Sequence, residues 1–199
     1  GATGVGTLGL VDFDFVEEHN LQRQVIHSMK DIKKSKLDSA KESVDNLNPN
    51  VNINLHNIRL NEENVLDVIK EYDLVIDGTD NFNVRYAIND ACLKLNKPLV
   101  YGSISRFEGQ VSVFNFNNGP CYRCLVPYST KNILNCTESG VLGTLPGVIG
   151  TLQATEAIKI ILDKGDVLNG RLLLFNALNM KFKEVKLNKN ENCRCGGKN

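Results

Sequence analysis

Residues 72–81 read YDLVIDGTDN. The stretch from Tyr72 to Asp77 is a largely apolar run closed by Gly78, and such a run is typical of a central parallel strand. In open α/β sheets, ligands bind at the loops that follow the carboxyl ends of parallel strands. The sequence therefore predicts a buried strand that ends in a ligand-binding loop, residues 78–81.

Strands and helices alternate on both sides of this stretch. The patterns predict strands over 7–12, 51–55, 72–77 and 99–103, and helices over 28–47, 61–69 and 83–95. This alternation predicts a Rossmann-like, doubly wound α/β sheet whose amino-terminal half is parallel. Further on, the patterns predict an antiparallel strand at 110–116, a loop at 127–144, a helix at 145–162 and a hairpin from 171–175 and 182–187. The carboxyl-terminal half of the sheet is therefore expected to be mixed or antiparallel.

The length and charge of the chain favour a single globular domain over a nucleic-acid-binding or membrane-spanning protein. A chain of 199 residues is expected to form a single domain, residues 1–199. Equal numbers of acidic and basic residues, 23 of each, give no basic excess that would favour nucleic acid. No apolar run is expected to span a membrane and no leader sequence is visible, so a cytoplasmic setting is expected.

The first residues do not supply a phosphate-binding loop. Gly1–Gly6 reads GATGVG, which does not fit the dinucleotide fingerprint G-x-G-x-x-G, and no strand precedes it. We expect this segment to be the end of a crossover helix and its turn. The chain is therefore expected to lack the first strand and the glycine-rich loop of such a sheet.

Several side chains could bind a nucleotide. Asp12 ends a predicted strand, where a carboxylate can accept hydrogen bonds from ribose hydroxyls. Residues 20–24 read NLQRQ, and Arg23 offers a fork of donors suited to phosphate oxygens. Lys36 follows as a second cation. For both cations, a solvated surface charge is the competing interpretation.

Asp80 lies in the loop after the strand at 72–77, where a Mg²⁺ ion with bound phosphates would be held. Aspartate is also a common helix cap, and a helix is expected to begin near Asn83. The residues alone favour the two interpretations equally.

Four of the six cysteines form two close pairs, Cys121 with Cys124 and Cys193 with Cys195. In a reducing compartment such pairs indicate metal ligands before disulfides. Four thiolates complete a closed, structural zinc site; two unrelated pairs of reduced cysteines are the alternative. Cys136 stands alone in the predicted loop, where it is either inert or a nucleophile, and Cys92 is expected to pack inside a helix.

Together these pieces resemble the ThiF/MoeB family, the relatives of ubiquitin-activating enzymes. The resemblance extends over the whole chain. It rests on VDFD at 11–14, NLQRQ at 20–24, Lys36, DGTDN at 77–81, EGQ at 108–110, the knuckle CYRC at 121–124 and GVIG at 147–150. One departure is the second cysteine pair, which is normally Cys-x-x-Cys in the family and is Cys193-x-Cys195 here.

The resemblance implies an adenylyltransferase that uses ATP and Mg²⁺, carries Zn²⁺, and acts on the C-terminal glycine of a ubiquitin-like sulfur-carrier protein ending in Gly-Gly. It implies that the nucleotide is bound by Asp12, His19, Asn20, Leu21, Gln22, Arg23, Lys36, Asp80, Asn81 and Arg85. Arg23, Lys36 and Asp80 would act in catalysis, and Cys136 matches a loop cysteine that forms covalent intermediates in some members.

The expected partners are the carrier, a second copy in a homodimer and a sulfurtransferase. The carrier and its pathway stay open among thiamine synthesis, molybdopterin synthesis and transfer-RNA thiolation. Two other functions compete with this interpretation. A non-catalytic partner subunit of the same fold would not need Arg23, Lys36 and Asp80. An NAD-dependent oxidoreductase would need an intact dinucleotide fingerprint and would leave the cysteine pairs unexplained.

Overall fold

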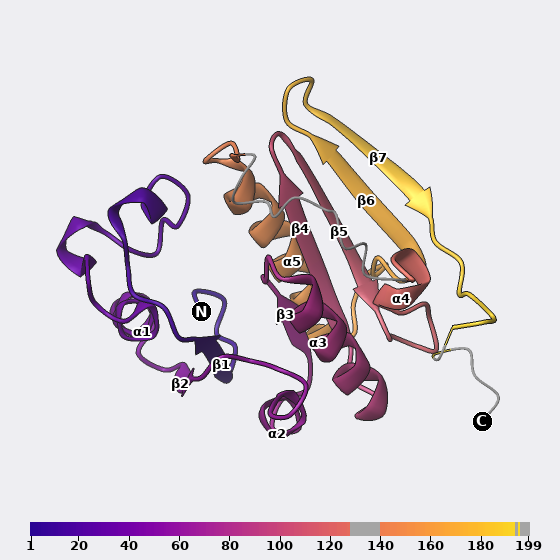
Figure 1. Ribbon diagram of the computed structural model, residues 1–199, viewed down its shortest axis with the longest axis horizontal. Helices are drawn as coiled ribbons and strands as arrows, with labels where there is room; N and C mark the ends of the chain where they lie inside the picture. The colour runs from indigo at the N-terminus through magenta and orange to yellow at the C-terminus, as the bar shows by residue number, and fades with distance from the viewer. Residues whose placement is uncertain (128–139, 194, 196–199) are drawn as a thin grey trace. The chain divides into compact units, whose positions relative to one another are not determined.

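The computed structural model describes residues 1–127, 140–193 and 195. These residues form two compact units, Gly1–Leu60 and Asn61–Asn199, and each is described by itself (Figure 1).

The first unit is a strand–helix–strand motif. Strand β1 (Thr7–Asp12) pairs in parallel with β2 (Asn52–Asn57), in a register that joins Leu8 to Ile53 and Leu10 to Leu55. Helix α1 (Lys36–Leu47) connects the strands and packs against both. The long connection from β1 to α1 contains two 3-10 turns, η1 (Glu18–Asn20) and η2 (Met29–Asp31).

Helix α1 begins later than the sequence predicts. Helical spacing favours a start at Ser28, yet the first helical residue is Lys36. Residues 33–36 instead pair with the segment after β1: the amide of Lys33 donates to the carbonyl of Val16, and the amide of Lys36 donates to the carbonyl of Asp14. This tertiary pairing overrides the local periodicity, and Lys33 adopts a φ of 70° that ends any helix there.

The second unit contains a five-stranded sheet. In spatial order its strands are β3 (Val75–Asp77), β4 (Leu99–Ser105), β5 (Glu108–Phe114), β6 (Arg171–Asn176) and β7 (Lys181–Lys186). The pair β3–β4 is parallel, and the three remaining pairs are antiparallel. The expected change from parallel to antiparallel pairing is confirmed. The strand predicted over 72–77 is shorter, and in the described sheet it lies at an edge.

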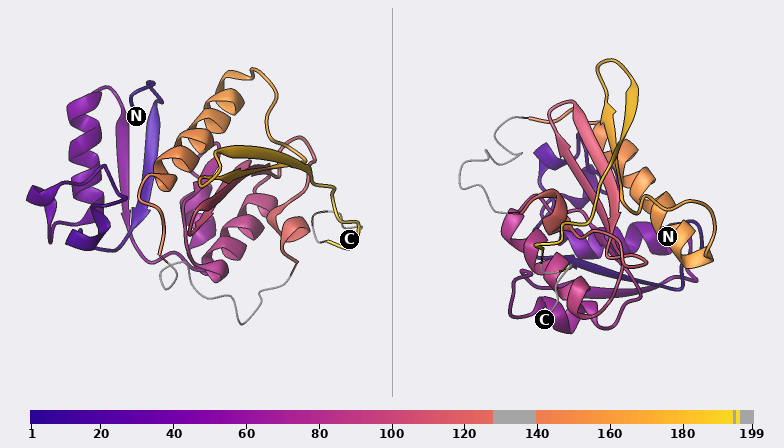
Figure 2. Two further views of the ribbon diagram at one scale, coloured as in Figure 1. Left: turned by 90° about the horizontal axis from the view of Figure 1, so that it is seen from above. Right: turned by 90° about the vertical axis from the view of Figure 1, so that its right-hand side faces the viewer.

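Helices cover both faces of this sheet. They are α2 (Val65–Ile69), α3 (Phe82–Lys94), α4 (Tyr122–Leu125) and α5 (Leu145–Leu162). The left view of Figure 2 shows α5 on one face and α3 on the other. The bounds of α5 are those that the sequence predicts.

Two glycines allow α5 to lie close to the sheet. A Cβ added to Gly102 on β4 would come within 2.3 Å of the Gln153 side chain, and one added to Gly109 on β5 would lie 2.4 Å from Cδ1 of Ile149. Real Cβ atoms do not approach other atoms so closely. The glycine of the EGQ sequence at 108–110 is therefore explained by helix packing.

The second unit has a separate cluster on each face of its sheet. The α5 side is aliphatic and contains Val100, Val111, Val113, Leu145, Ile149, Ala157, Leu168 and Phe175. The α3 side is aromatic: the rings of Tyr86, Tyr101 and Phe114 lie 5.3, 5.4 and 5.9 Å from the ring of Tyr122.

The sequence predicts no segment long and apolar enough to span a membrane, but α5 meets both criteria. Among the described residues it is the one helix long and apolar enough to do so, judged by its 18 residues and its composition. It also carries buried Gln153 and Glu156, which hydrogen bond within the unit. Core helices of water-soluble proteins pass the same test, so length and composition are weak evidence for a membrane span here.

Candidate active site and metal centre

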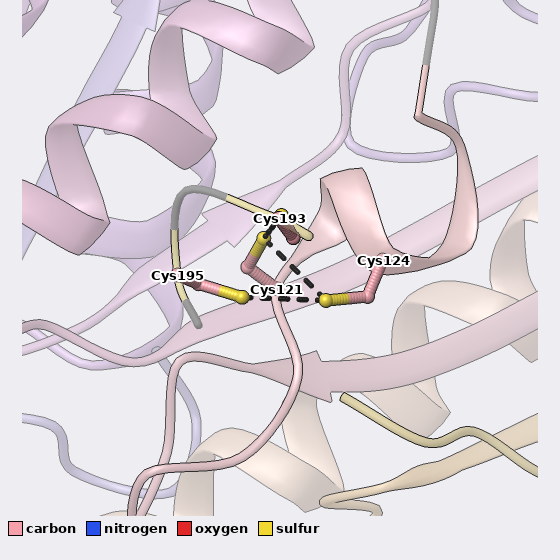
Figure 3. Close-up of side chains that lie close together, drawn as sticks. All are labelled: Cys121, Cys124, Cys193 and Cys195. Atoms are coloured by element: carbon pink, nitrogen blue, oxygen red, sulfur yellow. Dashed lines mark hydrogen bonds between the residues drawn. The ribbon is translucent and has the colours of Figure 1, made fainter. Parts of the chain in front are cut away.

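Four cysteine sulfurs meet beside α4 (Figure 3). The Sγ of Cys121 lies 4.0 Å from that of Cys124 and 3.5 Å from that of Cys193, and the Sγ of Cys124 lies 3.3 Å from that of Cys195. All four sulfurs lie within 4.8 Å of one another. The structure thus brings together the two pairs that the sequence singled out, although they are about seventy positions apart in the chain.

The spacing of the sulfurs fits a tetrahedral metal. Sulfurs held about 2.3 Å from a central Zn²⁺ lie roughly 3.8 Å apart, and the three separations given above lie on either side of that value. They are far longer than a disulfide bond of about 2.05 Å, and the four cysteines are free thiols. With four thiolates present, no coordination position is left for a substrate, so the arrangement suits a structural ion.

The protonation of these thiols depends on their surroundings. Burial raises the pKa of Cys121, and it raises the pKa of Cys195 to about 11. Burial also acts to raise the pKa of Cys124, but the backbone amides of Asn190 and Cys121 lower it overall. Thiolates are the metal-binding form, so metal binding here must displace protons and weaken as the pH falls.

The cysteine knuckle is fastened to α3. The amide of Tyr122 donates to Oδ1 of Asn89 at 2.8 Å. Arg123 binds both oxygens of Asp90, at 2.8 and 2.7 Å, and its guanidinium lies 4.4 Å from the ring centroid of Tyr86. Two residues of the knuckle thus fix its position on the helix.

The loop that joins β3 to α3 is built around Asp77. This carboxylate is buried, and its Oδ1 accepts hydrogen bonds from the amide and the hydroxyl of Thr79, both at 2.8 Å. Its Oδ2 accepts from Nε of Arg85 at 2.9 Å, and Nη2 of Arg85 donates to the carbonyl oxygen of Thr79. These hydrogen bonds fix the start of the loop, from Asp77 to Thr79, to Arg85 of α3.

Asp80 and Asn81 take different roles in this loop. The side chain of Asn81 caps α3, accepting from the amides of Asn83 at 2.9 Å and Val84 at 3.2 Å. The interpretation of Asp80 as the cap is therefore wrong. The Asp80 side chain is exposed, and none of the described residues pairs with its carboxylate.

Arg85 faces the protein interior. Its side chain is 5% exposed, and its guanidinium carbon lies 5.0 Å from the ring centroid of Tyr101 and 5.7 Å from that of Tyr122. Burial acts to lower the pKa of Arg85, but the Asp77 carboxylate raises it overall, so the group stays charged. The resemblance implies that Arg85 contacts phosphate, whereas its donors in this structure point to Asp77 and Thr79.

In the first unit, Asp12 is the last residue of β1 and Lys36 is the first residue of α1. Lys36 Nζ forms an ion pair with Oδ2 of Asp14 at 3.0 Å. Oδ1 of Asp12 accepts hydrogen bonds from the amides of Phe13 and Asp14, at 2.7 and 2.8 Å. Backbone amides therefore order the Asp12 side chain, and the Asp14 carboxylate orders that of Lys36.

Within residues 19–24, the side chains divide into buried and exposed. Asn20 is buried, and its Oδ1 accepts from the amide of Glu17 at 3.3 Å, so it organises the turn. His19 is exposed and pairs with Glu17 at 3.0 Å. Arg23 Nη1 donates to the carbonyl of His19 at 3.1 Å. Leu21 is half-buried and Gln22 is exposed.

The structure tests the prediction for one of the two remaining cysteines. Cys92 is completely buried, as expected for a packing residue, and burial raises its pKa to about 12. Cys136 lies outside the described residues.

Sequence reasoning missed two residues that support these loops. Gln153 of α5 donates to the carbonyl of Asp77 at 2.7 Å and to that of Val100 at 3.3 Å, and Asp14 is the partner of Lys36. Gln153 falls in line with Leu145 and Ile149 on the apolar stripe of its helix. A polar residue on such a stripe is a detectable signal, because a buried amide needs partners.

The comparisons with known proteins agree with this architecture. The model of the ThiF family matches residues 1–195. A protein of Porphyra purpurea named probable molybdopterin-synthase adenylyltransferase is 47% identical over 189 residues, 94% of this chain and 50% of its own length. The Aedes aegypti protein named adenylyltransferase and sulfurtransferase MOCS3 is 47% identical over 92% of this chain and 43% of its own length.

A crystal structure of E. coli MccB with ATP superposes with a TM-score of 0.85 at 21% identity, covering 98% of this chain and 62% of that one. At that identity the likeness shows the fold, which is the Rossmann-like fold expected from the sequence. The chain spans about half the length of the curated relatives it matches. From the extent of the family match, we conclude that the chain belongs to the ThiF family.

Proposed function

We propose that the protein uses ATP to adenylate the C-terminal glycine carboxylate of a ubiquitin-like sulfur-carrier protein and releases pyrophosphate. The names of the relatives support the reaction type, since both are called adenylyltransferases. The name of the Porphyra protein makes a carrier that serves molybdopterin synthase the first candidate substrate.

The position of Asp80 is the observation that carries this proposal. Its exposed carboxylate lies in the loop that follows the parallel strand β3, and Asn81 rather than Asp80 caps the next helix. Carboxylate oxygens at this end of a parallel strand suit Mg²⁺, which binds through one or two carboxylates and the substrate's phosphates. Asp80 is therefore the residue that would hold Mg²⁺.

The chemistry joins two anions. A carboxylate oxygen of the carrier attacks the α-phosphorus of ATP, the bond from that phosphorus to the bridging oxygen breaks, and pyrophosphate leaves with the electron pair. The product is a mixed anhydride between the glycine and AMP. No general base is needed, because the carboxylate is already ionised at neutral pH. Bound Mg²⁺ would supply positive charge that stabilises the transferred phosphoryl group.

The proposal assigns the remaining nucleotide contacts by motif. Asp12 would bind the ribose, residues 19–24 would line the nucleotide, and Arg23 and Lys36 would hold its phosphates. Lys36 is paired with Asp14 in this structure, so phosphate would compete with that carboxylate. The Lys36 side chain is 14% exposed and the Asp14 side chain is 51% exposed, so water can solvate the Asp14 carboxylate when phosphate replaces it.

Cys121, Cys124, Cys193 and Cys195 are proposed to bind Zn²⁺. Their geometry supports this, and the ion would act structurally. A homodimer and a sulfurtransferase partner are proposed on the family resemblance.

Cys136 is proposed to attack the acyl-adenylate, because AMP is a good leaving group. A thiol-sensitive adduct on a non-reducing gel would then require Cys136 and be absent from Cys136→Ala.

Pyrophosphate exchange tests the function. The protein is incubated with ATP, labelled pyrophosphate and carriers from thiamine, molybdopterin and transfer-RNA thiolation pathways, each intact or lacking its last glycine. We expect label to enter ATP with one intact carrier and not with its truncated form. Equal exchange with and without carrier, or none with any carrier, would contradict the proposal.

A further inference from the structure

A buried polar network lies beneath the loop that presents Asp80. From α5, Gln153 Nε2 donates to the carbonyl of Asp77 at 2.7 Å. From α3, Arg85 Nε donates to the carboxylate of Asp77 at 2.9 Å, and Nη2 donates to the carbonyl of Thr79. The network thus joins the helices on the two faces of the sheet to the last residue of β3.

We infer that Arg85 is a positioning residue: it fixes the loop 77–80 so that Asp80 is preorganised for Mg²⁺, and it does not itself contact phosphate. This inference rests on the proposed function for the role of Asp80. It reassigns Arg85, because the family resemblance placed this side chain among the nucleotide contacts.

The geometry requires the forked shape of arginine. Two different nitrogens of one guanidinium bind a side-chain oxygen of Asp77 and a main-chain oxygen of Thr79, two residues further on. The rigid guanidinium therefore sets the distance between the start of the loop and the residue before Asp80. A lysine keeps the charge but has one nitrogen, which cannot reproduce the planar fork.

Burial argues against a phosphate contact. The Arg85 side chain is 5% exposed and the Asp77 side chain is fully buried. The central carbon of the guanidinium lies over three aromatic rings, 5.8 Å from the ring centroid of Phe82, 5.0 Å from that of Tyr101 and 5.7 Å from that of Tyr122. Pulling the group toward a nucleotide would leave the Asp77 charge buried without its counter-charge, and breaking a buried ion pair in this way is strongly destabilising.

The aromatic cover links the loop to the cysteine knuckle. Tyr122 stands between Cys121 and Cys124, and its amide is held by Asn89 on α3 at 2.8 Å. Its ring lies beside the guanidinium of Arg85. The knuckle therefore helps to confine the arginine that supports the loop.

The test compares Arg85→Lys with a matched control, Arg171→Lys. Arg171 also binds a carboxylate, Glu184 at 3.0 Å, and donates to the carbonyls of Asp166 and Val167. It lies at the start of β6, away from the Asp80 loop in the sheet order. Amide hydrogen exchange of residues 78–81 is measured in each protein, together with the Mg²⁺ dependence of pyrophosphate exchange.

We expect Arg85→Lys to speed exchange of the loop amides while leaving those of β5 unchanged. The half-saturating Mg²⁺ concentration should rise by roughly 10-fold or more, as when an outer-shell partner of a metal ligand is lost, with little change in the KM for ATP at saturating Mg²⁺. Arg171→Lys should change neither the exchange of the loop amides nor the half-saturating Mg²⁺ concentration. Thr79→Val removes the hydroxyl that donates to Asp77. It should also speed loop exchange and raise the half-saturating Mg²⁺ concentration, but by less than Arg85→Lys.

The inference is overturned if Arg85→Lys and Thr79→Val leave loop exchange unchanged, or if the KM for ATP rises while the Mg²⁺ requirement stays constant, since that would indicate direct phosphate binding. Failure of the wild-type protein to exchange pyrophosphate with any carrier would instead count against the proposed function. The hydrogen-exchange comparison is decisive for the loop in either case.

Discussion

Three residues at the end of β3 and in the loop after it have different roles, two structural and one available for chemistry. Asp77 is buried and paired, Asn81 caps α3, and Asp80 between them is left exposed without a partner among the described residues. A cap satisfies backbone amides that the helix cannot satisfy itself. Because Asn81 fills this role, Asp80 is available to bind a cation.

The residue-scale prediction concerns Asp80. Asp80→Ala should abolish carrier-dependent pyrophosphate exchange, because the proposed Mg²⁺ ligand is lost, while the urea midpoint of unfolding stays within experimental error of the wild type. Asp73→Asn, an exposed carboxylate just before β3, is the matched control and should retain activity. An active Asp80→Ala protein would remove Asp80 from the mechanism.

At this scale the sequence identified the loop but not the division of roles within it. Asp80 and Asn81 are both good capping residues, so only the backbone path decides between them. Gln153 contributes from more than seventy positions away, and no local pattern connects it to Asp77. The cysteine cluster could be predicted from the sequence because metal sites impose short, regular spacings on their candidate ligands.

At the scale of elements, helix packing explains the glycines of β4 and β5. The Cβ of any residue larger than glycine at 109 would meet the Ile149 side chain on α5. Elements governed by their own periodicity, such as α5, were predicted with correct bounds. The start of α1 was not, because pairing of residues 33–36 with residues 14–16 displaced the helix that local spacing favoured.

The element-scale prediction is a double-mutant cycle. Gly109→Ala should lower the free energy of unfolding by about 1–3 kcal/mol, the usual range for overpacking a core. Ile149→Ala should cost about 2–5 kcal/mol through the cavity it leaves. Together they should cost less than the sum, because the new methyl group enters the space vacated by Ile149. Urea unfolding of the four proteins checks this, and strict additivity would count against direct packing at this contact.

At the scale of the whole molecule, the cysteine centre closes a long loop. It joins the knuckle that follows β5 to residues that follow β7, so a bound ion would hold the end of the described chain against α4. The second unit would then be stabilised by the metal as well as by its aliphatic and aromatic clusters.

Metal removal tests whether an ion at the cysteine centre stabilises the second unit. The purified protein should contain one zinc per chain by elemental analysis. Chelation should lower the free energy of unfolding by about 2.7 kcal/mol if free zinc had been at a hundred times its Kd. Cys193→Ser should lose the metal, whereas Cys92→Ala should keep it. A protein without zinc, or one whose stability is indifferent to chelation, would show that the cluster is a group of reduced thiols.

The central claim is that the carboxylate of a carrier's last glycine becomes joined to AMP. Intact-mass analysis of the carrier after incubation with the protein, ATP and Mg²⁺, with pyrophosphatase present to draw the reaction forward, measures that bond directly. We predict a carrier heavier by one adenylyl group, no such species for a carrier lacking its final glycine, and none with Asp80→Ala. A carrier of unchanged mass for every candidate pathway, under conditions in which the protein binds ATP, would contradict the account.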